Sequence, residues 1–182
     1  MALAHTILTV LAHAPQSGYD ISKQFDEQVS CFWKASQQQI YRELSKMEDQ
    51  GWVNYETIIQ PGKPDKKVYH LTAEGKVQLL RWFAEPTTPT PIREDLLVKV
   101  LAGPYGNRKL LIREIKHRKE IHELQLKHYL EKEILYQDCQ NPSVGDRFRY
   151  LTLRRGIRYE REWVEWCDEV MEFLEQMVQD YN

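Results

Sequence analysis

The chain of 182 residues is 42% hydrophobic and 29% charged, with only 8 Gly and 8 Pro, a composition typical of a helix-rich globular protein. Its formal net charge is −2, and residues 1–85 carry nine Lys or Arg against ten Asp or Glu. Bulk positive charge therefore cannot attract nucleic acid, and any DNA contact must rest on local placement of charge, doubled by dimerisation.

Cysteine usage and the apolar N-terminus indicate a cytoplasmic protein. Cys31, Cys139 and Cys167 are odd in number and form no C-x-x-C motif, which is typical of incidental thiols in a reducing compartment. Residues 1–15 lack a positively charged start and are too short to cross a bilayer, so we expect neither a signal peptide nor a membrane anchor.

Two helices are predicted at the start of the chain. Apolar positions in residues 2–14 recur at helical spacing, and Pro15 ends this segment. Residues 16–18 form a turn, and Ser17 followed by Asp20 is a capping-box pattern that begins a second helix, which runs to about residue 29. The residues predicted to face inward on it are Tyr19, Ile21 and Phe25.

The third predicted helix begins after Ser36, because Ser36 and Gln39 form another capping box. Its apolar face consists of Ile40, Leu44 and Met47, and its exposed side of Gln37, Gln38, Tyr41, Arg42, Ser45 and Lys46. Gly51 suits a left-handed C-cap that stops the helix. Three helices with a tight connection between the second and third form a helix-turn-helix core.

From Trp52 the apolar period changes to two, which predicts a half-buried strand. Its inward positions are Val53, Tyr55, Thr57 and Ile59. Residues 61–67 (PGKPDKK) form a turn that carries Lys63, Lys66 and Lys67, and residues 68–71 return as a second strand. Thr72 caps a fourth helix that ends before Pro86. This order of elements predicts a winged helix-turn-helix, in which one helix and one hairpin reach DNA together.

The proline-rich segment 86–91 (PTTPTP) is the predicted linker between a winged helix-turn-helix DNA-binding domain, residues 1–85, and a helical dimerisation domain, residues 92–182. The second domain should contain a short helix to about Leu101, a break at residues 103–104, and long helices over about residues 107–137 and 145–181. The predicted fold class is mainly α with a small β-hairpin.

The last predicted helix carries two adjacent apolar stripes. One consists of Trp163, Trp166, Val170, Phe173, Met177 and Tyr181, and the other of Val164, Cys167, Met171, Leu174 and Val178. Two stripes indicate a helix that packs on its own chain and on a partner chain, so we expect a homodimer. The predicted dimerisation residues belong to the first stripe and are Trp163, Trp166, Val170, Phe173 and Met177. The alternative is that both stripes are buried within one chain, although three helices offer little else to cover them.

Several stretches resemble PadR-family transcriptional regulators: SGYDISKQF in the second helix, FWKASQQQIYRELSKMEDQGWV across the third, and GKPDKKVYHLTAEGK through the wing. The remainder resembles the helical C-terminal domain of the longer PadR subfamily, similar to the virulence-activator-alpha type. The resemblance implies a homodimer, paired through C-terminal helices, that binds a palindromic operator and usually represses.

In a helix-turn-helix, exposed residues at the start of the recognition helix read base edges in the major groove, and glutamine can pair with adenine. Lysines in a wing suit phosphate contacts. The predicted DNA-binding residues are Ser36, Gln37, Gln38, Gln39, Tyr41, Arg42, Lys46, Lys63, Lys66, Lys67 and Lys23. The alternative is a solvated helix start and a solvated charged turn.

Aromatic residues raise the hypothesis of an effector pocket between the two domains. Trp33, Trp82 and Phe148, with Phe83 and Tyr150, can form flat walls for a small aromatic molecule. PadR relatives can respond to phenolic or other aromatic compounds, so the resemblance implies the same ligand class. The alternative is that these residues are ordinary core at helix junctions.

The sequence does not predict an enzyme, a cofactor or a metal site. It contains no G-x-S-x-G, Walker A or G-x-G-x-x-G motif. His117, His122 and His128 are spaced by five and six residues, which does not converge on a metal as i, i+4 spacing would. A winged-helix protein-interaction adaptor without specific DNA binding is the remaining alternative, because residues 1–85 are nearly neutral.

Overall fold

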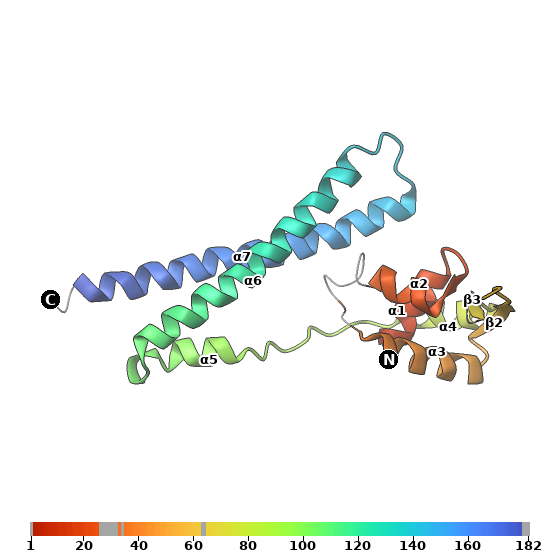
Figure 1. The fold of residues 1–182 in the computed structure, drawn as a ribbon, viewed down its shortest axis with the longest axis horizontal. Helices are drawn as coiled ribbons and strands as arrows, with labels where there is room; N and C mark the ends of the chain where they lie inside the picture. The colour runs from red at the N-terminus through yellow and green to blue at the C-terminus, as the bar shows by residue number, and fades with distance from the viewer. Residues whose placement is uncertain (1, 26–32, 34, 63–64, 180–182) are drawn as a thin grey trace. The chain divides into compact units, whose positions relative to one another are not determined.

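A computed structural model describes residues 2–25, 33, 35–62 and 65–179. The chain divides into two compact units, Met1–Pro89 and Thr90–Asn182. Within the described residues, the first unit combines four α-helices with a small sheet, and the second consists of helices (Figure 1). This agrees with the mainly helical fold class predicted from the sequence.

The helices of the first unit are α1 (Ala2–Leu11), α2 (Gly18–Gln24), α3 (Gln37–Asp49) and α4 (Ala73–Ala84). Strands β1 (Gln16–Ser17), β2 (Val53–Ile58) and β3 (Lys66–Leu71) form an antiparallel sheet in the order β1-β3-β2. The prediction of a turn at residues 16–18 was therefore wrong, because Gln16 and Ser17 pair with Tyr69 and Val68. A two-residue strand is too short to show alternation in a sequence.

An apolar core joins α1, α2, α3 and β2, and its fully buried side chains are Ile7, Leu8, Ile21, Phe25, Ile40, Leu44, Met47 and Val53. The predicted helix starts are confirmed: Ser17, Ser36 and Thr72 each accept a hydrogen bond from the backbone N–H three residues further on. Gly51 adopts a φ of 71°, which confirms the predicted left-handed end of α3.

Three side chains predicted to face inward do not do so. Tyr19 is 64% exposed, Thr57 is exposed, and Ile59, which lies beyond the end of β2, is 80% exposed. The strand β1 pairs only with Tyr69 and Val68, so among the described residues the sheet has two strands at the end of the hairpin where Thr57 lies. Periodicity marks the strand, but it does not show how far the core extends along it. The predicted end of the second helix near residue 29 lies outside the described residues.

The second unit contains α5 (Asp95–Leu101), the short 3₁₀ helix η2 (Gly103–Tyr105), α6 (Arg108–Gln137) and α7 (Val144–Gln179). These bounds match the predicted helices and breaks closely. The helices α6 and α7 run alongside each other in opposite directions (Figure 1). Leu96 of α5, Ile115 of α6 and Cys167 of α7 form the centre of a small apolar core.

The structure places part of the predicted dimerisation stripe in this core. Val170 is buried beside Cys167 and Leu174, and Trp163 and Trp166 pack against the same cluster. Phe173 is 60% exposed. The side chain of Met177 lies outside the described residues. The two predicted stripes therefore do not separate into one intrachain face and one intermolecular face. Val170 of the first stripe and Cys167 and Leu174 of the second are buried in the same intrachain core.

Candidate nucleic-acid interface

The start of α3 is fixed by a complete capping box. The backbone N–H of Ser36 donates to Gln39 Oε1 at 2.8 Å, and the backbone N–H of Gln39 donates to Ser36 Oγ at 3.3 Å. The side-chain oxygen of Gln39 is therefore already hydrogen-bonded to the backbone N–H of Ser36 at the start of α3. The side-chain amides of Gln37 and Gln38, the other two glutamines predicted to read bases, take no part in this capping box.

The remaining predicted residues of α3 share one exposed face. Tyr41, Arg42, Ser45 and Lys46 are all exposed, opposite the buried apolar face of the same helix. Lys46 Nζ lies 3.6 Å from Glu43 Oε2 within α3. A surface pair of this kind contributes little to stability, so Lys46 can exchange the carboxylate for a phosphate.

Tyr41 connects this face to the start of α2. A Cβ atom placed on Gly18 would lie only 2.5 Å from Tyr41 Cε1, so the tyrosine ring packs directly against the glycine backbone. Gly18 therefore allows α2 and α3 to approach each other closely. The polar face of α3 and the N-terminus of α2 form one continuous surface.

Two of the predicted wing lysines lie on strand β3 and not in the turn. Lys66 Nζ forms an ion pair with Asp20 Oδ2 at 2.9 Å, and Asp20 also accepts a hydrogen bond from Ser17 Oγ at 2.7 Å. The Ser17 hydroxyl and, after it, the Lys66 ammonium hold the pKa of Asp20 below its usual range. Lys66 thus fastens β3 to the start of α2, and a phosphate would have to compete with Asp20 for it.

Lys67 is exposed on the wing. Its Nζ lies 3.7 Å from the centroid of the Tyr55 ring on the neighbouring strand, and contact with Tyr55 raises the pKa of Lys67. Its positive charge is therefore held over β2 and remains open to solvent. Lys23 is exposed on the last turn of α2, and Lys63 lies outside the described residues.

The predicted effector residues are not brought together within either unit. In the first unit, Trp82 stacks on His5 with ring centroids 4.7 Å apart, and Trp33 lies in the connection before α3. Phe148 belongs to the second unit and is 67% exposed on α7. Trp82 therefore has a structural role at the contact of α1 with α4.

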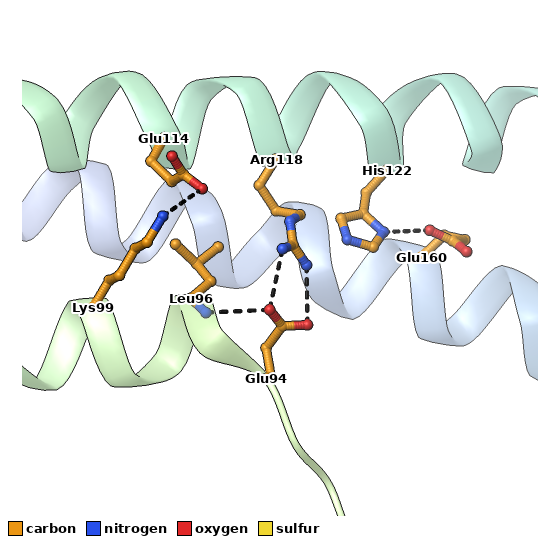
Figure 2. A network of polar contacts seen from close by, with 7 residues as sticks. All are labelled: Glu94, Leu96, Lys99, Glu114, Arg118, His122 and Glu160. Atoms are coloured by element: carbon orange, nitrogen blue, oxygen red, sulfur yellow. Dashed lines mark hydrogen bonds and ion pairs between the residues drawn. The ribbon is translucent and has the colours of Figure 1, made fainter.

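Sequence reasoning missed a polar network inside the second unit (Figure 2). Arg118 donates two hydrogen bonds to Glu94, at 3.0 and 3.1 Å, and Glu94 also caps α5 by accepting from the Leu96 N–H. His122 Nδ1 lies 2.5 Å from Glu160 Oε2, with both residues buried. Ile115, His122 and Tyr129 are buried at intervals of seven residues, so the spacing of His122 was the available signal.

Two further observations concern the described part of the chain. None of its helices is both long enough and apolar enough to cross a membrane. No group of three or more His, Cys, Asp or Glu residues in these segments has the arrangement needed to hold a metal ion.

Both units match known protein families. Residues 7–81 match the transcriptional regulator PadR-like family, and residues 92–175 match the family described as virulence activator alpha C-term. A probable transcriptional regulator of Mycobacterium tuberculosis, Rv1176c, is 37% identical to the chain, in a match that covers 97% of this chain and 99% of that protein.

Solved structures show the same fold. The Vibrio cholerae virulence activator AphA matches with a TM-score of 0.80 and 34% identity, covering 96% of this chain and 99% of AphA. Bacillus subtilis PadR in complex with operator DNA matches with a TM-score of 0.82, 27% identity and the same coverage of both chains. A complex of B. subtilis PadR with p-coumaric acid matches with a TM-score of 0.77 and 25% identity, again with that coverage.

Proposed function

Because the chain belongs to the PadR family of transcriptional regulators, we propose that it represses transcription by binding a palindromic DNA operator as a homodimer. The family consists of DNA-binding regulators and not of enzymes. The observation that carries the proposal is the structure of α3, whose three inward apolar side chains are fully buried while its capped, polar outer face is exposed.

In this proposal, α3 enters the major groove with its N-terminal turn foremost. Gln37 and Gln38 read base edges, and Arg42, one turn further along, contacts a base or a phosphate. Lys46 and Lys67 contact the backbone on either side, and Lys63 extends the wing contacts. Lys66 contributes mainly by holding β3 against the start of α2, because Asp20 already neutralises it.

A single copy of this surface offers few cations, so the proposal requires two copies. Near-neutral residues 1–85 supply no long-range attraction for DNA. The second unit exposes large apolar side chains that a partner chain would cover, including Leu124 and Leu135 on α6 and Phe148 and Phe173 on α7. Phe173 thus remains a proposed dimerisation residue, whereas Trp163, Trp166 and Val170 pack against the apolar core of their own chain.

The proposal includes release of the operator by a small aromatic acid. Its support is the complex of the PadR relative with p-coumaric acid. The chain can be titrated with p-coumaric acid while tryptophan fluorescence and operator binding are followed together. A fluorescence change that leaves operator affinity unchanged, or no change in either, would remove the effector from the proposal.

Substitution of Arg42 tests the DNA-binding face. Arg42→Ala should weaken operator binding by about tenfold to a hundredfold, the usual value of one bidentate base contact, without lowering the melting temperature. Arg81→Ala is the matched control, because Arg81 is also exposed in the first unit but lies on α4. Equal losses in both variants would indicate unspecific attraction and would contradict a reading face on α3.

Salt dependence separates DNA binding from the adaptor function. Each phosphate neutralised by a protein cation makes log affinity fall with log salt concentration by a slope of about 0.9. Lys67→Ala should reduce that slope by about one for each protomer. Retention on operator DNA that ignores salt would favour an adaptor. A reporter gene downstream of the operator measures the sign of regulation, and lower expression in the presence of the protein is the expected result.

A further inference from the structure

The far end of the β2–β3 hairpin carries exposed apolar residues. Ile58 ends β2 and is 44% exposed, Ile59 follows it and is 80% exposed, and Pro61 is exposed as well. We call residues 58–61 the wing tip. The strand β2 lies at the edge of the sheet, and exposed β-branched residues at the end of an edge strand favour unwanted association between chains. An apolar surface in this place is therefore unfavourable unless a partner covers it.

The backbone of the wing tip is restrained. Pro61 fixes its own φ and restricts Gln60 before it to extended conformations. Gly62, the next residue, adopts a φ of 73° and lets the chain turn there. The side chains of Ile58 and Ile59 branch at Cβ, so few rotamers are open to them. The wing tip can thus bind a partner without a large loss of conformational entropy.

The hairpin is fastened to the surface that carries α3. The strand β1 pairs with β3 directly before α2 begins, and Lys66 Nζ of β3 lies 2.9 Å from Asp20 Oδ2 of α2. Tyr41 of α3 packs against Gly18, the first residue of α2. These contacts hold the hairpin in a defined position relative to the face of α3 that is proposed to read bases.

The hairpin extends well past the core of the first unit. Tyr55 packs against that core, and Ile59 lies four residues further on, about 13 Å at the rise of a strand. The major groove of B-DNA is about 12 Å wide and the minor groove about 6 Å. A hairpin that starts beside α3 in the major groove therefore reaches the neighbouring minor groove with its tip. Lys67, which pairs with Thr57 between Tyr55 and Ile59, then lies at the phosphates that separate the two grooves.

The chemistry of the wing tip fits the minor groove at A·T pairs. Isoleucine and proline are among the residues that proteins insert into this groove as apolar wedges. An A·T pair exposes only the adenine N3 and thymine O2 acceptors there, whereas a G·C pair adds the guanine 2-amino group. An isoleucine side chain cannot accept a hydrogen bond from that amino group. Its burial against a G·C pair would leave the donor without a partner, which is unfavourable.

We propose that the wing tip enters the minor groove next to the α3 contacts and that Ile59 there makes the operator prefer A·T pairs. Ile58 and Pro61 contact the sugar walls of the groove, and Lys67 contacts the phosphates beside it. The inference rests on the proposed DNA-binding function and adds a second reading element to it. This element recognises bases by shape and by the absence of an amino group, whereas α3 reads the major groove by hydrogen bonds.

Base substitution in the operator tests the groove and the preference. The probe is the operator recovered by selection from random DNA, with the pairs that flank the α3 contacts changed in both half-sites. Replacing A·T by G·C should weaken binding of the full chain at least about fivefold, the lower range for a changed base pair. Inosine·cytosine pairs should restore affinity to within about twofold, because they present the major-groove edge of G·C without the 2-amino group.

Three outcomes of this experiment would overturn the proposal. Binding to inosine·cytosine as weak as binding to G·C would assign these pairs to major-groove reading. Equal binding to all three operators would show that the wing tip reads nothing. Recovery of operators with G·C fixed at these positions would contradict the preference itself.

Substitution of Ile59 tests the residue. Ile59→Ser should bind the A·T and G·C operators within about twofold of each other, and its melting temperature should not change, because the side chain is 80% exposed. Ile59→Val keeps a β-branched apolar side chain and should keep most of the preference. Leu80→Ser is the matched control, since Leu80 is 59% exposed on α4 of the same unit, and should keep all of it. Retention of the full A·T preference in Ile59→Ser would overturn the proposal.

Two comparisons separate failure of this inference from failure of the proposed function. Loss of binding in Arg42→Ala, with an A·T preference in Ile59→Ser equal to that of wild type, would keep α3 as a reading helix and remove only the wing tip. A wild-type chain that prefers no DNA sequence would contradict both. If Ile59→Ser changed the dimer constant in sedimentation velocity and kept the A·T preference, the wing tip would belong to a contact between proteins, and the inference would be overturned.

Discussion

The fully buried side chains of the first unit are apolar and come from α1, α2 with Phe25 just after it, α3 and β2, whereas an ion pair and a buried histidine connect α5, α6 and α7 of the second unit. In the first unit, caps and glycines set where each helix begins and ends and how closely it approaches its neighbour. In the second unit, long helices have few local signals along their length, and partners distant in sequence set their alignment. Signals close in sequence thus set the helix ends of the first unit, while polar pairs between residues distant in sequence align α6 with its neighbours in the second.

The largest expected effect is loss of the buried pair in the second unit. His122→Ala leaves Glu160 buried without its partner and should lower the free energy of unfolding of that unit by about 3–5 kcal/mol. The double variant His122→Leu with Glu160→Leu is the control, since it removes both polar groups and should stay within about 1 kcal/mol of wild type or above it. Hydrogen exchange on each unit measures the effect. A loss below 1 kcal/mol in His122→Ala would mean that the pair does not determine the register.

The first unit should be most sensitive at Gly75. A Cβ atom at this position would lie 2.1 Å from the Trp52 carbonyl oxygen, so the backbone would have to move. Gly75→Ala should therefore destabilise the first unit by about 1–3 kcal/mol. Gly103→Ala in the second unit, where the added atom would meet Leu111 Cδ2 at 3.5 Å, is the control for the same substitution without a clash and should stay within about 0.5 kcal/mol. Similar melting temperatures for the two variants would show that α4 and the end of α3 are less closely packed than the structure indicates.

A smaller effect is expected at the cap of α4. The Thr72 hydroxyl donates toward the carbonyls of Gly51 and Trp52, at 2.7 and 2.9 Å, and accepts from the Gly75 N–H at 3.0 Å. Thr72→Val removes these bonds with little change of shape and should cost about 1 kcal/mol. Thr72→Ser keeps the hydroxyl and should recover most of the loss in a urea titration. A Thr72→Val variant as stable as wild type would show that the cap contributes nothing to stability.

The smallest effect concerns acid stability of the second unit. The Arg118 guanidinium is the main cause that holds the pKa of Glu94 below its usual range. A carboxylate with a lowered pKa in the folded state stabilises the fold above its unfolded pKa of about 4.3, and this contribution is lost as pH falls through the folded value. Glu94→Gln should therefore cost up to about 1 kcal/mol at pH 7, and the difference from wild type should vanish at pH 2. A difference that grows on acidification would have the wrong sign.

Much of the first unit could be predicted because its signals are local. Ser17, Ser36, Thr72 and Gly51 mark helix ends within three or four residues, and the structure confirms each. The polar face of α3 followed from the spacing of Ile40, Leu44 and Met47. The strand β1 could not be found, since two residues carry no period, and its partner Tyr69 is more than fifty residues away.

The second unit shows the opposite pattern. The break at residues 103–104 and the long segments of helical spacing on either side of residue 141 predicted the lengths of its helices, but not which face of α7 its own chain covers. Val170 and Phe173 belonged to one predicted stripe, and the structure buries the first and exposes the second. The pairing of His122 with Glu160 depends on the alignment of α6 with α7, over a separation of 38 residues. The periodicity of one helix does not contain that alignment.

Selection of bound fragments from random double-stranded DNA tests the central claim most directly, namely that a nearly neutral winged unit reads DNA only when a dimer presents it twice. The expected result is an inverted repeat whose half-site centres are separated by a whole number of helical turns, each of about 10 base pairs. A fragment with one half-site should then bind the wild-type chain far more weakly than the repeat. Enrichment of a single, unrepeated site that binds as tightly as any pair would contradict the account.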